Sequence, residues 1–452
     1  MALCIALSVV TFAAYMATSN NSERSPYSHR SFWELDRYAG PWDYAVIGAG
    51  ITGLNAALEI KIQEPRSRVL VLEARQTGAV ASSRNAGFLC LGSPSEMCAL
   101  LDAQGETAWL HWTAAKWAGI QRLLRLMGAK SLRYQKVKAY ELLTPSGPFR
   151  ISNFVNEQVL GRIPELNRLL DEALTLSLPF SNQRKRTKST TLPWSSPYFG
   201  EPNFVDQSHG WGAPGLMTLP MAYEGQVHPM FVLDSLKRYA QNLGVVVLQG
   251  CPVQGLGPMG LGLQELVMED QALVIQTKNI ILCTNALTNS LIPRPEVIPQ
   301  RGQVLVSAPL PGGLPKRLMG NFHGDSGYLY FRNLGLDRLL LGGARNLDFQ
   351  GEQNDQWAEN SLLTEHLTHY AYDVLGLNSD ELKWEQAWSG TMGFTASGVP
   401  HLQALGPGRW LVAGMNGMGM ALGPEMGRRV ARWAMISGKV DPYSLGLLPK
   451  PV

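Results

Sequence analysis

The chain has 452 residues, of which 45% are hydrophobic and 17% charged, and its formal net charge at pH 7 is +3. This length exceeds what one small core requires, so two or three domains are expected in an ordinary globular protein. The small net charge favours neither a nucleic-acid binder nor an acid-rich tail, and no nucleic-acid partner is expected. The five cysteines are scattered without a C-x-x-C motif, so we predict neither a metal site nor a disulfide framework.

The first sixteen residues are uncharged and mostly apolar. They are fewer than the roughly 20 residues of a spanning helix, and no Lys or Arg precedes them as in a signal peptide. Three interpretations stay open: a membrane anchor, a cleaved signal, and an extension of no structural consequence. Basic residues follow the segment, so insertion would leave the body of the protein in the cytoplasm. We therefore expect a cytoplasmic protein, with a membrane contact through residues 1–18 as the open alternative.

Residues 43–54 read DYAVIGAGITGL, a G-x-G-x-x-G turn between a short apolar strand and an apolar helix. Twenty residues later the next strand ends in Glu73. This order is typical of dinucleotide binding: the glycines permit a tight turn, approach of the pyrophosphate and close helix packing, while the acidic residue binds a ribose. The helix N-terminus offers free N–H groups to the phosphates. The predicted cofactor residues of this unit are Gly48, Gly50, Ile51, Thr52, Gly53, Glu73 and Ala74.

Helical and strand-like segments alternate along the rest of the chain. Helices are predicted over residues 108–127, where a Trp and Leu stripe is interpreted as core, and over residues 231–243 and 424–436. Short buried strands are predicted at residues 245–248, 279–283 and 410–414.

Strands typical of a nucleotide-binding fold are thus interrupted by two long stretches, of which the second contains alternating strands. One discontinuous nucleotide domain threaded by a β-rich second domain explains this better than two tandem domains. The predicted division is residues 1–40 as an apolar segment and linker, 41–97 with 226–299 and 396–440 as the nucleotide domain, 98–225 with 300–395 as the second domain, and 441–452 as a tail.

Further motifs are GAVASSRNAG at residues 78–87, PQRGQ at 299–303, WSG at 388–390, TASGVP at 395–400 and AGMNGMGM at 413–420. Together with the glycine turn, they resemble the FAD-dependent oxidoreductases of the D-amino-acid oxidase and sarcosine oxidase type. The resemblance implies an α/β fold: a Rossmann-type FAD-binding domain with an inserted α+β substrate domain built on a mostly antiparallel sheet. It adds to the predicted cofactor site Ser82, Ser83, Arg84, Asn85, Gly87, Val253, Thr284, Asn285, Gly414, Asn416, Gly417, Met418, Gly419 and Met420.

The departures from this family concern the substrate side. Amino-acid oxidases of the family hold the substrate carboxylate with an Arg shortly after the W-x-G element, where this chain has Met392, and sarcosine oxidases place a Lys where it has Ala421. The family's flavin-tethering Cys and His have no counterpart, so the FAD is expected to be non-covalent. A substrate without an α-carboxylate, or with its carboxylate held elsewhere, is favoured. The pattern is most similar to the branch that oxidises amines such as γ-glutamylputrescine.

No catalytic residue is assigned, but four substrate-side candidates follow from spacing. Tyr328, Tyr330 and Arg332 lie with period two on one predicted strand, so we expect them to face the same side. Arg345 follows the next strand. A structural ion pair is the alternative role of Arg332, and His323 is interpreted as a surface or hydrogen-bonded histidine.

These features predict an FAD-dependent oxidoreductase that oxidises a C–N bond of a small amine or amino-acid-like substrate. A hydride passes from the α-carbon to flavin N5, and the C–N bond becomes that of an imine. The electron acceptor is expected to be oxygen or a quinone. Two alternatives stay open. One is a hydroxy-acid dehydrogenase that passes electrons to a membrane quinone, favoured weakly by the apolar N-terminus. The other is a flavin-binding subunit of an RNA-modifying complex, for which only the basic cluster at residues 184–188 argues; we otherwise interpret that cluster as a solvated loop.

Overall fold

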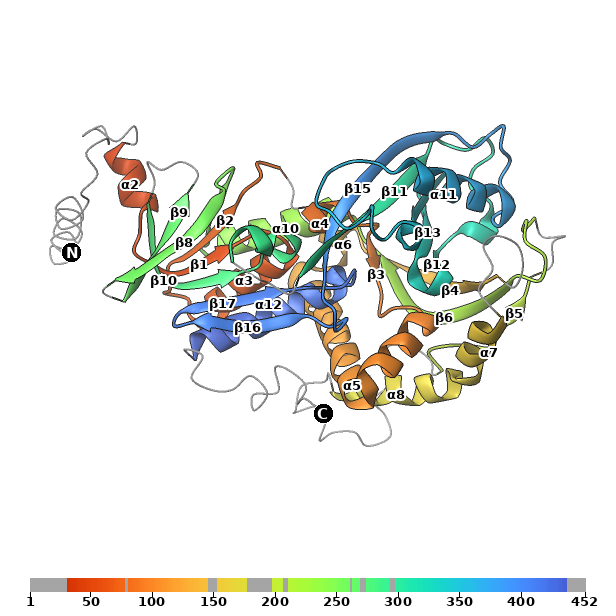
Figure 1. Cartoon of the computed structure of the whole chain (residues 1–452), viewed down its shortest axis with the longest axis horizontal. Coiled ribbons are helices and arrows are strands. Elements are labelled where there is room, and N and C mark those ends of the chain that lie inside the picture. Colours follow the sequence, from red (N-terminus) through yellow and green to blue (C-terminus); the bar gives the residue numbers. More distant parts are fainter. Residues whose placement is uncertain are drawn as a thin grey trace.

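The computed structural model describes residues 31–77, 80–144, 153–176, 197–205, 210–260, 262–268, 274–292 and 297–436. Its strands form two sheets, which occupy the two halves of the molecule (Figure 1). The predicted fold class, a Rossmann-type domain with a second domain on a mostly antiparallel sheet, is confirmed. The apolar residues 1–18, the basic cluster at 184–188 and the tail at 441–452 lie outside the described residues.

The first sheet is parallel at its centre, in the order β16-β17-β10-β1-β2-β7, and only β16 is antiparallel to its neighbour on this path. Every residue of β2 is buried, as expected of a central parallel strand. The hairpin of β8 and β9 joins β10 in antiparallel fashion. The strands are β1 (Trp42–Ile47), β2 (Val69–Glu73), β7 (Val246–Gln249), β8 (Val253–Gly260), β9 (Leu263–Met268), β10 (Ile275–Leu282), β16 (His401–Gly406) and β17 (Arg409–Ala413).

The second sheet runs in the order β15-β11-β14-β13-β12-β4-β6-β3, with β5 paired to β6. Its neighbours are antiparallel except β4 and β12, which are parallel. The strands are β3 (Phe88–Leu89), β4 (Gln135–Leu143), β5 (Asn203–Phe204), β6 (Met217–Gln226), β11 (Ile298–Ser307), β12 (Asn321–Gly324), β13 (Leu329–Leu334), β14 (Arg338–Gly343) and β15 (Trp384–Phe394).

The helices are α2 (Phe32–Tyr38), α3 (Ile51–Gln63), α4 (Val80–Arg84), α5 (Pro94–Met127), α6 (Ala129–Leu132), α7 (Asn153–Gly161), α8 (Ile163–Leu176), α10 (Pro229–Asn242), α11 (Ser361–Asp373) and α12 (Gly419–Met435), with 3-10 turns η2 (Asn285–Ser290), η3 (Lys316–Leu318), η4 (Asp325–Gly327) and η5 (Arg345–Leu347). The helices predicted at residues 108–127 and 231–243 are confirmed. The last helix begins at Gly419, before the predicted start, because Pro424 lies inside it and not in its first turn.

Helix α5 joins the two halves of the molecule. It bends at Gly105, and its second part carries the predicted core stripe, including the buried Trp112, Trp117 and Leu123. This part packs against α8 and α12.

The predicted domain boundary at residue 97 does not coincide with the sheets. Strand β3 lies within the segment predicted for the nucleotide domain but pairs in the second sheet. Residue 97 therefore does not mark a packing boundary, and the exact domain limits stay a prediction.

No helix in the described part of the chain is both long and apolar enough to span a membrane.

Candidate active site

The glycine turn between β1 and α3 has the geometry that the fingerprint predicts. Gly48 has φ +102°, and a Cβ there would lie 2.8 Å from the carbonyl oxygen of Cys283. A Cβ on Gly53 would lie 1.9 Å from the carbonyl oxygen of Gly48. The turn is therefore closed to larger side chains, and the N-terminus of α3 is held directly against the ends of the central strands.

Glu73 ends β2 next to this turn and is 8% exposed. Its Oε2 accepts from the Ala49 N–H at 2.9 Å, and its Oε1 accepts from the Arg75 N–H at 3.1 Å. Two backbone donors thus fix the carboxylate, and each oxygen keeps a lone pair for a ribose hydroxyl. Binding of the ribose by Glu73 stays a prediction.

A cavity of about 360 Å³ runs from the glycine turn to the face of the second sheet. Most predicted cofactor residues line it, although they come from six separate segments. They are Gly48, Gly50, Ile51, Thr52, Glu73, Ala74, Ser82, Arg84, Asn85, Gly87, Val253, Thr284, Asn285, Asn416, Gly417, Met418, Gly419 and Met420. The substrate-side candidates Tyr328, Tyr330 and Arg345 line the same cavity.

Three predicted cofactor residues do not line the cavity: Gly53, Ser83 and Gly414. Gly53 acts through helix packing, as described above. Gly414 has φ +75°, and a Cβ there would lie 2.3 Å from the Thr395 methyl carbon. Its N–H donates to Asn285 Oδ1 at 2.9 Å, so it positions η2 against the end of β17. These glycines shape the site without forming its wall.

The C-terminal glycine-rich turn ends at the first residue of α12. Asn416 has φ +49°, and its Oδ1 accepts from the Thr395 N–H at 2.9 Å, which ties the turn to the end of β15. Met418, Gly419 and Met420 bring the N-terminus of this 17-residue helix to the cavity wall. Backbone N–H groups at a helix N-terminus stabilise negative charge, so the turn fits the electron-rich end of a reduced flavin.

Arg332 is the substrate-side candidate that the structure does not bring into the cavity. It is 6% exposed, and its guanidinium donates to the carbonyl oxygens of Gly87 at 3.0 Å and Val227 at 3.3 Å. Burial lowers its pKa to about 10. Arg332 therefore does not reach the cavity as predicted, and within the described residues it forms no ion pair. It joins two backbone segments behind the site.

Arg345 begins η5, one residue after the end of β14, and its side chain reaches the cavity. Its guanidinium donates to Gln300 and lies 4.1 Å from the ring centre of Phe394 and 5.0 Å from that of Tyr328. Gln300 pairs with Met392 across β11 and β15, so Arg345 reaches the strand position that lacks a cation. Burial lowers the pKa of Arg345, and within the described residues no salt bridge compensates its charge.

Two further polar residues, Glu96 and His323, line the cavity although the sequence did not predict them as site residues. His323 lies in β12 with its Nε2 2.9 Å from Glu224 Oε1, which confirms a hydrogen-bonded histidine but not a surface one, since it is 6% exposed. Glu96 lies in the first turn of α5. No local motif marks either residue, because the cavity is assembled from strands and helices far apart in the sequence. Cys90 also lines the cavity and is a free thiol.

The chain matches the DAO family, FAD dependent oxidoreductase, over residues 43–171 and 205–433, and it belongs to this family. It is 26% identical over 327 residues to the bifunctional protein ThiO/ThiG of Synechocystis sp., covering 71% of this chain but only 41% of that protein. It is 23% identical over 399 residues to the probable oxidoreductase OrdL of Haemophilus influenzae, covering 86% of this chain and 82% of that protein.

Solved structures show the same fold. The glycine oxidase of Geobacillus kaustophilus superposes with a TM-score of 0.62 at 17% identity, covering 91% of this chain and 99% of that one. The iminodiacetate oxidase of Chelativorans sp. BNC1 gives 0.63 at 17% identity, covering 89% and 98%. Family membership makes the chain an FAD-dependent oxidoreductase with FAD as its cofactor. The branch related to γ-glutamylputrescine oxidation stays a prediction.

Proposed function

We propose that this enzyme oxidises the C–N bond of an amine or amino-acid-like substrate bound between the C-terminal glycine-rich turn and the second sheet. The observation that carries the proposal is that one cavity joins the dinucleotide residues to a wall with a cation, Arg345, that has no salt bridge within the described residues. FAD, when bound, supplies the acceptor for the hydride. The side chains of the chain have to bind the substrate, orient it and exclude water.

Arg345 is the group that we assign to substrate binding. Gln300 holds its guanidinium, and Phe394 and Tyr328 shield it, so a substrate carboxylate would gain a charge-assisted hydrogen bond in a poorly solvated place. Arg345 would then bind the carboxylate from a different position than the family's usual Arg or Lys, since Met392 and Ala421 stand at those two positions and carry no charge. The same cavity-lining Tyr328 and Phe394, together with Tyr330, would pack on the apolar part of the substrate.

The names of structurally similar proteins support C–N chemistry, since they include a glycine oxidase, an iminodiacetate oxidase and an L-amino acid deaminase. One similar structure is instead an L-α-glycerophosphate oxidase. Its name supports the alternative in which the chain oxidises a hydroxy acid.

The test is an anaerobic titration of the purified, FAD-loaded enzyme with amines, amino acids, N-substituted amino acids and hydroxy acids. We expect the flavin absorbance near 450 nm to bleach with members of the first three groups. Bleaching by hydroxy acids alone would contradict the proposal and favour the C–O alternative. Reoxidation of the bleached enzyme by oxygen or by a soluble quinone then identifies the class of electron acceptor.

A further inference from the structure

His323 is a charged hydrogen-bond donor in the wall of the cavity. Glu224, which is fully buried, accepts from its Nε2, and Asn321 Nδ2 donates to the other oxygen of Glu224 at 2.9 Å. Burial alone would lower the pKa of His323, but Glu224, with Glu96 and Glu141 nearby, raises it to about 9. The ring is therefore protonated at neutral pH and carries an N–H on both nitrogens.

The second nitrogen of His323 has no hydrogen bond within the described part of the chain. The carboxylate nearest to Nδ1 is that of Glu96, and its Oε2 lies 3.9 Å away, beyond hydrogen-bond reach. Glu96 is held in place because the same oxygen accepts from the Ser93 N–H at 2.9 Å in the capping box of α5. Both residues line the cavity. One charged donor and one carboxylate thus face the same space.

This pair selects the kind of group that can bind between them. A carboxylate would be attracted by His323 but repelled by Glu96, and an ammonium would meet the opposite conflict. A carboxamide avoids both conflicts, because its carbonyl oxygen accepts from Nδ1 and its NH₂ donates to the carboxylate. It also brings no additional charge into a buried place.

We infer that His323 and Glu96 form a subsite for a neutral carboxamide at the far end of a substrate whose carboxylate binds Arg345. The inference rests on the proposed function only for the place and orientation of the substrate. It adds a selectivity that neither the glycine motifs nor Arg345 provides: neutral amide ends over acidic and basic ends of the same length.

The test measures binding to the oxidised flavin, before any bleaching by a ligand that is also a substrate. The oxidised, FAD-loaded enzyme is titrated while its flavin absorbance is followed. One series of ligands is succinamate, succinate and 4-aminobutyrate, and the longer series is glutaramate, glutarate and 5-aminopentanoate. All titrations contain EDTA, because donor atoms of Cys90, Glu224 and His323 lie within 4.8 Å of one another and could bind stray metal ions. In at least one series we expect the amide to bind about tenfold more tightly than both charged ligands, the effect of roughly one hydrogen bond.

Two variants reverse the preference in opposite directions. Glu96→Gln removes the repulsion and keeps the capping-box pattern, so the dicarboxylate should then bind at least as well as the amide. His323→Gln removes the cation, so the ω-amino acid should gain relative to the dicarboxylate. Retained FAD and a cooperative unfolding transition establish that each variant is folded. The midpoint of His323→Gln should be lower than that of the wild type, because the buried carboxylate of Glu224 loses its cation.

Equal binding of the three end groups in the wild type would overturn the inference, as would an unchanged preference in both variants or no binding of any ligand. The proposed function fails separately. If the amide preference is present but no amine or amino acid bleaches the flavin, the subsite stands and the assigned reaction does not. If bleaching occurs without the preference, the reaction stands and the subsite does not.

Discussion

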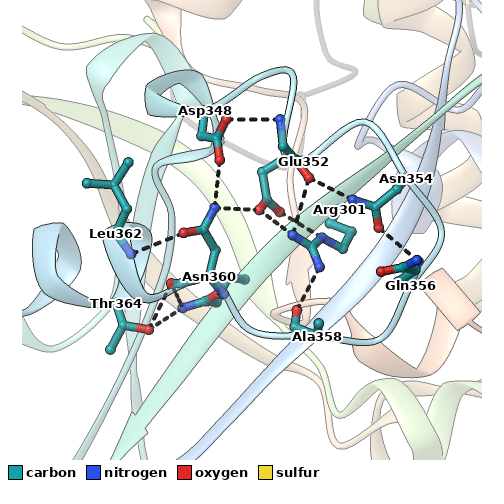
Figure 2. A network of polar contacts seen from close by, with 11 residues as sticks. Arg301, Asp348, Glu352, Asn354, Gln356, Ala358, Asn360, Leu362 and Thr364 are labelled. Atoms are coloured by element: carbon teal, nitrogen blue, oxygen red, sulfur yellow. Dashed lines mark hydrogen bonds and ion pairs between the residues drawn. The ribbon is translucent and has the colours of Figure 1, made fainter.

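Three arginines in and beside the second sheet differ in what their guanidinium groups contact. Arg301 pairs with the buried carboxylate of Glu352 at 2.7 Å, in the network of Figure 2. Arg332 donates to two backbone carbonyls, and Arg345 donates to the neutral side chain of Gln300. The partner and not the residue type decides the role: only Arg345, of these three, combines access to the cavity with an unpaired charge.

Arg345→Met should weaken binding of carboxylate ligands by about 10- to 100-fold, because a charge-assisted hydrogen bond is worth roughly 1.5–3 kcal/mol. Arg332→Met is the matched control. It should leave ligand affinity nearly unchanged but lower the free energy of unfolding by about 1–3 kcal/mol, since the carbonyl oxygen of Val227 loses its guanidinium donor and that of Gly87 keeps only the Val227 N–H. Ligand titration and urea unfolding of both variants separate the two roles. A loss of affinity confined to Arg332→Met would reverse the assignment.

Glu73→Gln should weaken FAD binding by about 1–3 kcal/mol, because a charged acceptor at the ribose position becomes neutral. In the wild type the carboxylate accepts a hydrogen bond from the Ala49 N–H. In the variant this hydrogen bond is lost if the amide turns its NH₂ group toward Ala49. Fluorescence titration of the apoprotein with FAD measures the change. Glu385→Gln, in an exposed pair on the second sheet, is the control and should bind FAD like the wild type. Wild-type affinity in Glu73→Gln would show that the ribose binds elsewhere.

At the scale of elements, the loop between β14 and α11 links the second sheet to the cofactor segment. Asn360, near the end of the loop, donates to Asp348 near its start at 3.0 Å and to the Glu352 carboxylate that Arg301 binds at 2.9 Å (Figure 2). The loop carries Trp357, whose ring centre lies 4.0 Å from the guanidinium carbon of Arg75 and 4.5 Å from that of Arg84. Since Arg84 lines the cavity, the loop supports the cofactor side from the substrate sheet.

Breaking this network should cost far more than breaking an exposed ion pair. In Arg301→Met the carboxylate of Glu352, which is 1% exposed, loses its cation, and the free energy of unfolding should fall by about 3–5 kcal/mol. The exposed pair of Arg338 and Glu385 is the control, and Arg338→Met should cost less than about 1 kcal/mol. Urea unfolding of the FAD-loaded proteins gives both values. Equal losses would show that burial does not set the strength of these pairs.

At the scale of the whole molecule, the two sides of the cavity differ in how far the sequence predicts them. The cofactor side could be predicted because its turns are contiguous motifs: a glycine turn and a strand-ending Glu73 carry their geometry with them. The substrate side is built from side chains whose partners are remote. His323 is 99 residues from Glu224, and Arg332 is 245 residues from Gly87. Periodicity predicts which way such side chains face, but not what the opposite strand or helix offers them.

The missing tether residues predict that acid precipitation releases the FAD into the supernatant. The absorbance spectrum of the supernatant and the colour of the pellet measure this directly. Flavin that stays with the pellet would show a covalent bond. Cys90, a free thiol of the cavity wall, would then be the first residue to replace, and Cys98, which does not line the cavity, would be the control.

The N-terminal boundary of the folded body can be tested by truncation. Ser31 caps α2, Leu35 and Tyr38 of this helix pack on the core beneath the first sheet, and the carbonyl oxygen of Ala39 accepts from the Gln276 N–H at 2.8 Å. Deletion of residues 1–30 should therefore leave FAD content and thermal midpoint unchanged. Deletion of residues 1–40 also removes these contacts and should lower the midpoint, because apolar core surface becomes exposed. Loss of FAD in the shorter deletion would mean that residues 1–30 support the cofactor domain.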